Sequence, residues 1–345
     1  MIGEQDLLNS INVFPVADSD TGTNLSLTLT AALAVLPTSS DKPLGTLLAA
    51  LADALLDGAR GNSGAIVAQF FQGISDSAAD LSRFTTHTFS AAVCKGSDYA
   101  HDALSNPREG TILSVIAAFA GSLQQAVNEN RNGRFEEVTK VALAAAEQAL
   151  ADTPKQLDVL RKAGVVDAGA KGFVELVDGF HGYLHDGTVA PAPDPELFRH
   201  IEPAVDFAES DNASKFRFCT ECMVTAEDID RRKLREALTE LGDSLVLAGT
   251  KRKAKIHIHV DRPDDVFALA ERFGELSGQK ADDMHRQQHS THDGRARFAV
   301  ITDSAADIPD EDMERLDIHM VPCRIQFGDR SYLCLLYTSP SPRDS

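Results

Sequence analysis

Apolar residues recur three and four positions apart over most of the first half of the chain, a pattern that predicts amphipathic helices. The pattern is clearest in four segments, namely 25–36, 44–56, 112–127 and 135–150. The alternating, β-branched runs typical of a sheet are missing from this half of the sequence. We therefore expect an all-helical first domain covering residues 1–187.

Three glycine-containing loops interrupt these helices, and each comes directly before another helical pattern. They are residues 58–64 (GARGNSG), 106–110 (NPREG) and 166–169 (VDAG). A helix N-terminus carries unpaired N–H groups and the positive end of the helix dipole, so such loops suit an anion if they converge in space. Their spacing along the chain does not show whether they converge.

The pattern changes after residue 187. Prolines at positions 191, 193 and 195 resist helix formation, which predicts a linker over 188–198. Residues 199–284 then read as a small α/β sandwich, with strands at 215–224, 244–250 and 254–260 and helices at 231–241 and 263–276. We expect the polar stretch 285–296 to be a second linker, with a metal site at its histidines as the open alternative.

Residues 297–333 have the pattern of a further α/β unit. Residues 298–303 read as a buried parallel strand, and 320–327 as the next strand. The unit ends before it could close a core, so we expect the natural protein to be longer. Residues 334–345 resemble the translated sequence of a sequencing adapter, and we expect them to be foreign to the protein.

Composition narrows the classes of function. The chain has 345 residues, of which 43% are hydrophobic and 25% charged, as in folded globular proteins. A net charge of -19 argues against nucleic acid as a partner and against a polybasic membrane anchor. Neither an apolar stretch of about 20 residues nor a signal peptide is evident, which predicts a cytoplasmic protein without an integral membrane segment. The five scattered cysteines favour reduced thiols or metal ligands over disulfides.

Two carboxylates stand one residue apart in a short polar loop before the first long helix. Asp18 and Asp20 at this spacing can direct hard oxygen ligands at one site, and Mg²⁺ prefers one or two carboxylates together with substrate phosphates. They can equally form turns or cap the helix, as Asp residues commonly do. Taken alone, the pair leaves both interpretations open.

Four ordered blocks add to this picture, since together they resemble the ATP-binding subunit of bacterial dihydroxyacetone kinases and, more closely, the fatty acid kinase A family. They are NVFPVxDxDTGTN (12–24), GARGNSG (58–64), EGTIL (109–113) and VVDAG (165–169). The resemblance continues through 216–222, 255–259 and 282–284, and then through 301–309 and 327–329. It implies a multidomain chain: an all-α DhaL-type helical barrel, a FakA-like α/β middle domain, and an incomplete DegV-like α/β segment.

By the same resemblance, Asp18 and Asp20 hold two Mg²⁺ ions that bridge the phosphates of ATP, with Asn12 as a further ligand. Arg60 is a candidate for neutralising the transferring phosphoryl group, and a surface ion pair is the alternative for this side chain. The remaining nucleotide contacts implied by the family are Thr21, Gly22, Thr23, Asn24, Gly61, Asn62, Ser63, Gly64, Gly110, Thr111, Asp167 and Gly169.

The implied reaction is phosphorylation of a fatty acid carboxylate, carried by a DegV-type domain, to an acyl phosphate. Such a carboxylate is already ionised at neutral pH and needs no general base. Ser19 departs from the family, which usually has Gly between the two aspartates, so we expect a shifted loop. A dihydroxyacetone-kinase-like enzyme with another small acceptor and a non-catalytic lipid-binding or regulatory protein stay open as alternatives, as does a homodimer.

A second group of candidate ligands lies in the middle domain. His257 and His259 are two apart on a predicted strand and so share a face, while Cys219 lies on another strand. These residues form a Zn²⁺ donor set, with Cys222 as a fourth ligand, or else a half-buried sheet face with hydrogen-bonded histidines. In the DegV-like segment, Thr302, Asp303 and Ser304 follow a strand and by resemblance border a lipid carboxylate.

Overall fold

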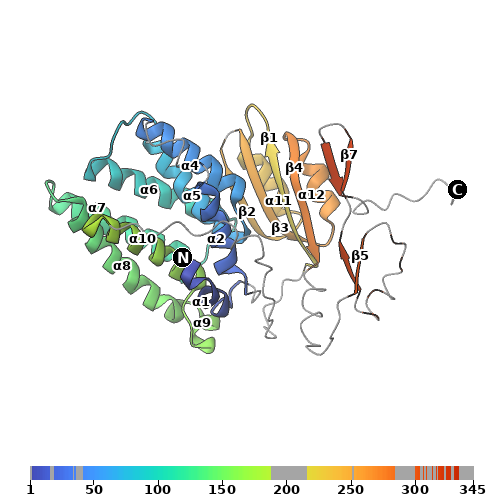
Figure 1. Cartoon of the computed structure of the whole chain (residues 1–345), viewed down its shortest axis with the longest axis horizontal. Helices are drawn as coiled ribbons and strands as arrows, with labels where there is room; N and C mark the ends of the chain where they lie inside the picture. Colours follow the sequence, from blue (N-terminus) through green and yellow to red (C-terminus); the bar gives the residue numbers. More distant parts are fainter. Residues whose placement is uncertain are drawn as a thin grey trace.

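The computed structural model has a helical half and a half built around a sheet (Figure 1). The expected fold class, a helical domain followed by a small α/β region, is confirmed. The expected linkers 188–198 and 285–296 and the segment 334–345 lie outside the described residues. The structure describes residues 2–15, 19–33, 35, 42–187, 216–250, 252–283, 300–303, 306, 308, 313, 316, 318–321, 324–327 and 330–333.

The helical domain packs its apolar helix faces into one core. Phe173 lies at its centre, edge-on to Phe70 at 5.3 Å and to Phe119 at 6.0 Å between ring centroids, an arrangement that favours aromatic pairs. The helices are η1 (Ile2–Glu4), α1 (Gln5–Ser10), α2 (Thr21–Leu33), α4 (Leu44–Gly58), α5 (Gly61–Ser77), α6 (Thr86–Asp102), α7 (Ile112–Glu129), α8 (Phe135–Gln156), α9 (Asp158–Ala163) and α10 (Ala168–Asp186).

The second half is a four-stranded antiparallel sheet in the order β2-β3-β1-β4, with two helices on one face. Alternate residues of the strands, such as Val224 and Ile256, pack with Leu234 of α11 and Phe267 of α12 in a buried core. The elements are β1 (Phe218–Thr225), α11 (Arg231–Thr239), β2 (Asp243–Gly249), β3 (Lys253–Val260), α12 (Pro263–Ala270) and β4 (Glu275–Asp283).

One element of this half was not predicted from the sequence. The expected helix 263–276 ends at Ala270, and Glu275–Asp283 forms the edge strand β4 instead. The prediction was wrong because ELSGQKADD has a single large apolar residue, Leu276, and so lacks the alternation that marks a strand. The pairing of β1 with β4 shifts register between Glu221 and Met223, close to Gly278, whose φ is +60°.

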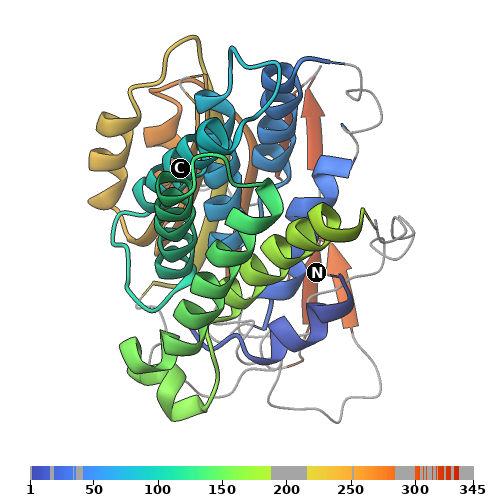
Figure 2. The ribbon, with the colours of Figure 1, turned by 90° about the vertical axis from the view of Figure 1, so that its left-hand side faces the viewer.

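The other face of the sheet packs against the helical domain. Val246 and Ala248 of β2 join Leu56, Ala65 and Ala103 in a second apolar cluster. The segment after α6 extends the edge of the sheet, since the N–H of Leu247 donates to the carbonyl of Ala103 at 2.9 Å. Figure 2 shows the helices in front of the strands from this side. The two halves therefore share a continuous, partly buried interface.

The DegV-like segment contains two short strand pairs. The strand β5 (Val300–Asp303) pairs in parallel with β6 (Ile318–Val321), and β7 (Arg324–Phe327) forms a hairpin with β8 (Arg330–Leu333). The expectation of a buried strand at 298–303 is wrong for its described part, because Ile301 is 66% exposed. Within the described residues, β6 is the strand that pairs with β5, and a two-stranded sheet cannot bury both faces.

Among the helices of the described ranges, none combines the length and apolar character needed to cross a bilayer.

Candidate functional site

The N-terminus of α5 lies against α2 at Asn24 and Thr28, so the first two sequence blocks meet in space. The backbone N–H of Arg60 donates to Thr28 Oγ1 at 3.1 Å. Gly61 follows with a φ of +55°, and a Cβ at this position would collide with the side chain of Asn24. Glycine is favoured here by the backbone conformation, because the left-handed region disfavours residues that carry a Cβ.

Two of the residues implied to bind the nucleotide connect α2 to α1. Thr23 exchanges hydrogen bonds with Asn9, from Thr23 N to Asn9 Oδ1 at 3.1 Å and from Asn9 Nδ2 to Thr23 Oγ1 at 3.0 Å. A Cβ on Gly22 would overlap Leu8 and the carbonyl of Gln5. Gly22 and Thr23 therefore have a packing role in this structure, which the sequence pattern did not indicate.

The acidic loop is described only in part. Asp18 lies outside the described residues, while Asn12 is buried and Asp20 is partly buried at the start of α2. The carbonyl of Asp20 accepts from Asn24 N at 2.8 Å, which begins the helix. Ser19 has a φ of +51°, in the left-handed region. Residue 19 keeps a glycine-like conformation even though this chain carries serine there.

The other two glycine loops converge on a single carboxylate. Asp167 caps α10 by accepting from Ala170 N at 2.8 Å, and its carboxylate lies near the backbone of Ile112 at the start of α7. Burial raises the pKa of Asp167 to about 6, against the effects of these two backbone groups. Thr111 caps α7, Gly110 precedes it with a φ of +81°, and Gly169 lies beside Ile112. The chain's own anion thus occupies both helix N-termini.

The start of α5 offers unsatisfied polar groups. The first N–H groups of a helix, here those of residues 61–63, have no partner within the helix. Asn62 Oδ1 is buried without a hydrogen-bond partner among the described residues. A buried amide oxygen of this kind is satisfied by a donor such as a metal-bound water. Gly64 differs, because its N–H bonds to the Arg60 carbonyl and its missing Cβ makes room for Thr28.

A cluster of three potential ligands lies on the sheet face turned toward the helical domain. The donor atoms of Cys219, His257 and His259 lie within 4.8 Å of one another. The sequence prediction that they share a face agrees with this arrangement. Cys222 does not join them: it is 1% exposed in the core on the opposite face, so the prediction of a fourth ligand there is wrong. Residues three apart on a strand point to opposite faces.

The two histidines differ in their electrostatic surroundings. His257 Nδ1 lies 2.9 Å from Glu221 Oε1, and Cys219 Sγ lies 3.8 Å from the same nitrogen. Burial acts to lower the pKa of His257, but the neighbouring Cys219 and Glu221 outweigh it and raise that pKa well above its usual value. For His259, burial and the charge of His257 lower the pKa to about 3, so this ring is neutral.

This arrangement suits a metal ion. His259 Nδ1 is buried without a hydrogen-bond partner among the described residues, and the Asp243 carboxylate at 3.7 Å is too distant for a hydrogen bond. A neutral imidazole is the form that binds metals, and Cys thiolates and His imidazoles are both Zn²⁺ ligands. The contact of Glu221 with His257 Nδ1 leaves Nε2 as the ligand atom and orients the ring.

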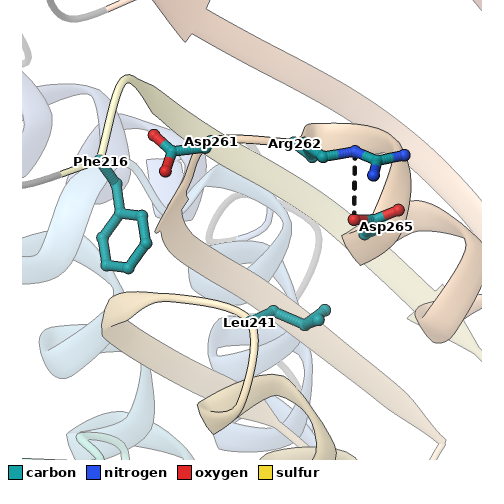
Figure 3. A pocket seen from close by; sticks show the side chains of 5 residues that line it. All are labelled: Phe216, Leu241, Asp261, Arg262 and Asp265. Carbon is teal, nitrogen blue, oxygen red and sulfur yellow. Dashed lines mark ion pairs between the residues drawn. The ribbon is translucent and has the colours of Figure 1, made fainter.

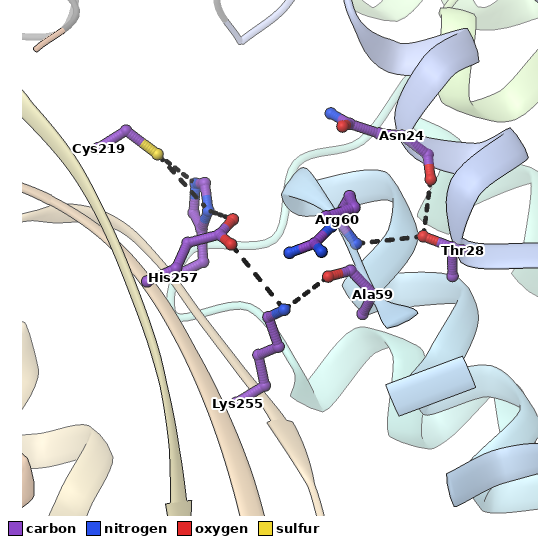
Figure 4. A network of polar contacts seen from close by, with 8 residues as sticks. Asn24, Thr28, Ala59, Arg60, Cys219, Lys255 and His257 are labelled. Carbon is purple, nitrogen blue, oxygen red and sulfur yellow. Dashed lines mark hydrogen bonds and ion pairs between the residues drawn. The ribbon is translucent and has the colours of Figure 1, made fainter. Parts of the chain in front are cut away.

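Glu221 and Lys255 connect this cluster to the glycine loop, and the sequence analysis did not single out either residue. Lys255 Nζ donates to the carbonyl of Ala59 at 2.6 Å and lies 3.9 Å from Glu221 Oε2. Burial lowers the pKa of Lys255, and the nearby charge of Arg60 acts in the same direction. Figure 4 shows the guanidinium of Arg60 turned toward the sheet. The candidate site therefore lies where the two domains meet.

The strand pattern contained a signal for these two residues. Glu221 is two positions from Cys219, and Lys255 is two positions from His257, so each shares the face of a predicted ligand.

A separate small pocket lies where β1 begins and β3 ends (Figure 3). Its lining includes an ion pair between Arg262 Nε and Asp265 Oδ2 at 3.4 Å. None of the candidate catalytic or metal-binding residues lines it.

The residues implied to border a lipid lie at the end of β5. Thr302 and Asp303 form the last part of this strand, whereas Ser304 lies outside the described residues. The structure thus places two of the three at the carboxyl end of a parallel strand, where open α/β sheets bind ligands.

Three family models match the chain in sequence order. A DAK2 domain matches residues 15–182. The FakA-like middle domain, named for the fatty acid kinases, matches residues 215–291. A DegV family model matches residues 297–335. The first match covers the helical half and the second covers the sheet that carries Cys219, His257 and His259.

Several curated bacterial proteins are similar to this chain. An uncharacterised protein of Staphylococcus saprophyticus is 34% identical over 315 residues, covering 88% of this chain and 56% of the relative. Protein YloV of Bacillus subtilis is 34% identical over 296 residues, covering 82% of this chain and 52% of that protein. An uncharacterised protein of Staphylococcus aureus is 33% identical over 294 residues, covering 82% of this chain and 53% of that protein. The chain spans about half the length of these relatives.

Proposed function

This chain has the domain architecture of the fatty acid kinase A family, and we propose that it is an ATP- and Mg²⁺-dependent kinase that phosphorylates the carboxylate of a fatty acid. The DAK2 and FakA-like matches support a kinase-type function, and the DegV-like segment supports an association with fatty acids. The observation that carries the proposal is the position of the Cys219–His257–His259 cluster opposite the glycine loop of the helical domain.

The helical domain supplies the nucleotide side of the proposed site. The N–H groups at the start of α5 and the guanidinium of Arg60 can bind phosphate oxygens. Asp18 and Asp20, with Asn12, are the proposed Mg²⁺ ligands, and the unpartnered Asn62 Oδ1 fits a metal-bound water nearby. Bound Mg²⁺ neutralises charge on the phosphates, which lowers the barrier to attack by an anion. Asp167 already places an anion at α7 and α10, so the phosphates bind at α5 instead.

The reaction requires two anions to approach each other. A carboxylate oxygen of the fatty acid attacks the γ-phosphorus, and the bond from phosphorus to the β–γ bridging oxygen breaks, with its electron pair leaving on ADP. No proton moves and no redox change occurs, so the protein has to position the groups and reduce their repulsion. Arg60 is a cationic group on the helical side of this junction.

We assign the cluster on the sheet as a Zn²⁺ site held by Cys219, His257 and His259. A bound Zn²⁺ adds positive charge on the acceptor side of the junction. Glu221 orients His257 for this role through its 2.9 Å contact with Nδ1.

The proposal is tested by incubating the chain with ATP, Mg²⁺ and a separately supplied DegV-type protein loaded with oleate, and trapping acyl phosphate with hydroxylamine. We expect a hydroxamate product that disappears in Asp18→Ala and Asp20→Ala, while His87→Ala, on the separate helix α6, keeps it. Phosphorylation of dihydroxyacetone in place of oleate would contradict the carboxylate acceptor.

A second candidate is a non-catalytic lipid-binding or regulatory protein. The observation that favours it is Ser19, which occupies a left-handed position between the two aspartates. Absence of Mg²⁺-dependent ATP binding in a titration would support this candidate over the kinase.

A further inference from the structure

We infer that Lys255, acting with Glu221, is a positioning residue that holds the glycine loop of the helical domain at a set distance from the Cys219–His257–His259 cluster. The inference rests on the proposed phosphoryl transfer across the junction of the two domains. It names residues that neither bind the nucleotide nor serve as metal ligands.

On the helical side, the contact is made at the point where the loop begins. Ala59 ends α4 and directly precedes Arg60, the N-cap of α5. Its carbonyl accepts from Lys255 Nζ at 2.6 Å, and the next residue is held by the bond from Arg60 N to Thr28 Oγ1 at 3.1 Å. Ala59 is completely buried with Lys255 in place, so removal of the lysine takes a hydrogen-bond donor away from a buried carbonyl. The start of the loop is therefore fixed from both the sheet and α2.

On the sheet side, the same ammonium group connects to the ligand cluster. Glu221 lies between Lys255 and His257, with Oε2 at 3.9 Å from Lys255 Nζ and Oε1 at 2.9 Å from His257 Nδ1. Glu221 is the register partner of His257 in the pairing of β1 with β3. Because paired strands are rigid, Lys255 keeps a fixed position relative to the three ligands of the cluster. A movement of the glycine loop relative to Lys255 therefore changes the distance from the loop to the whole cluster.

The contact between Lys255 and Glu221 is a poor source of stability by itself, because burying its two charges costs free energy of desolvation. The side chains of Lys255 and Glu221 are 11% and 9% exposed. Removing two charges from water opposes folding, and well-packed apolar residues commonly stabilise such a site as much or more. What a charged pair adds is a defined geometry, since Lys255 Nζ meets a directional acceptor on one domain and a carboxylate on the other.

Lys253 provides a matched control within the same strand. It lies two residues before Lys255 and also spans the domains, with Nζ at 3.0 Å from Asp53 Oδ1 and 3.1 Å from Asp57 Oδ2. Its side chain is 29% exposed, and its partners on α4 are about half exposed. Exposed ion pairs contribute little to the free energy of folding. Removal of Lys253 therefore takes away a charge between the domains but leaves the buried contacts of Lys255 in place.

The experiment compares Lys255→Met with Lys253→Met by two readouts. The first is hydrogen exchange of the backbone amides of residues 58–64, measured without substrate. We expect exchange to become faster by about tenfold or more in Lys255→Met and to stay near the original rate in Lys253→Met. The second is phosphoryl transfer, where we expect kcat to fall by about 10- to 100-fold with the KM for ATP within about twofold.

The outcomes separate this inference from the proposed function. If the unmodified chain transfers no phosphoryl group, the kinase proposal fails, and hydrogen exchange alone decides the role of Lys255. Unchanged exchange in folded Lys255→Met overturns the inference, as does an equal response in Lys253→Met. If Lys255→Met does not fold, Lys255→Gln replaces it, because the polar amide is tolerated at a part-buried site but is one bond too short to reach the Ala59 carbonyl in the same position. We expect faster exchange of residues 58–64 in Lys255→Gln as well, and unchanged exchange there overturns the inference.

Discussion

The carboxylate of Asp167 accepts a hydrogen bond from the N–H of Ala170 at 2.8 Å and lies near the backbone of Ile112, so one buried anion lies at the N-termini of two helices that begin 56 residues apart in the chain. This contact joins two glycine loops whose convergence the sequence left undecided. It also gives the stability of the helical domain a specific dependence on pH.

Asp167→Asn tests that dependence. The pKa of Asp167 is raised from 3.8 to about 6 by burial, so the folded state favours the protonated form. The resulting contribution to the free energy of unfolding is complete below pH 3.8 and is lost as the pH rises through about 6. Urea unfolding at pH 4.5 and 7.5 should show the original protein losing about 2 kcal/mol relative to Asp167→Asn. An identical pH response of the two proteins would contradict the assignment.

Ser19→Gly should stabilise the loop between the two aspartates. Ser19 has a φ of +51°, and the left-handed region costs a non-glycine residue about 1 kcal/mol. Part of this gain is lost to the greater freedom of glycine in the unfolded chain. We expect a rise of about 0.5–1 kcal/mol in the free energy of unfolding, measured with urea. Ser10→Gly, in the helix α1, is the control and should lower it.

Gly64→Ala should destabilise the contact between α2 and α5. A Cβ on residue 64 would overlap Thr28 Oγ1, so the helices have to separate or the threonine has to move. We expect a loss of about 1–3 kcal/mol. Gly121 in α7 has no atom within 4 Å of its Cβ position, so Gly121→Ala should raise stability by about 0.5–1 kcal/mol. Thermal or urea unfolding of both variants checks the opposite signs; equal effects would show that helix propensity alone governs both sites.

Zinc binding should depend on residues of the sheet face that is turned toward the helical domain. We expect about one Zn²⁺ per chain by elemental analysis, and its loss in Cys219→Ser and in His259→Ala. Cys222→Ala, on the opposite face, should keep the metal. Zinc at background level in the unmodified chain would remove the metal assignment and leave a hydrogen-bonded histidine pair. Retention of zinc by Cys219→Ser would exclude that thiol as a ligand.

Local sequence patterns were sufficient for much of this protein. Apolar periodicity located the helices α2, α4, α7 and α8, and each of the three glycine loops does precede a helix, at Gly61, Ile112 and Ala168. The alternation of His257 and His259 placed them on one strand face, and β3 agrees with it. These features depend on side-chain period and backbone preference within a few residues, which a sequence carries directly. The strand β4 was not predicted because its sequence shows neither the side-chain period nor the backbone preference of a strand.

Relations between distant residues were decided only by the tertiary structure. Ala59 and Lys255 are 196 positions apart, and their contact depends on how the apolar cluster around Val246 and Leu56 docks the sheet on the helices. Asp167 reaches Ile112 because α7 and α10 pack side by side. A sequence specifies which faces are apolar, but many pairings of such faces bury similar area. Only the assembled fold determines which polar groups those pairings bring within hydrogen-bond distance.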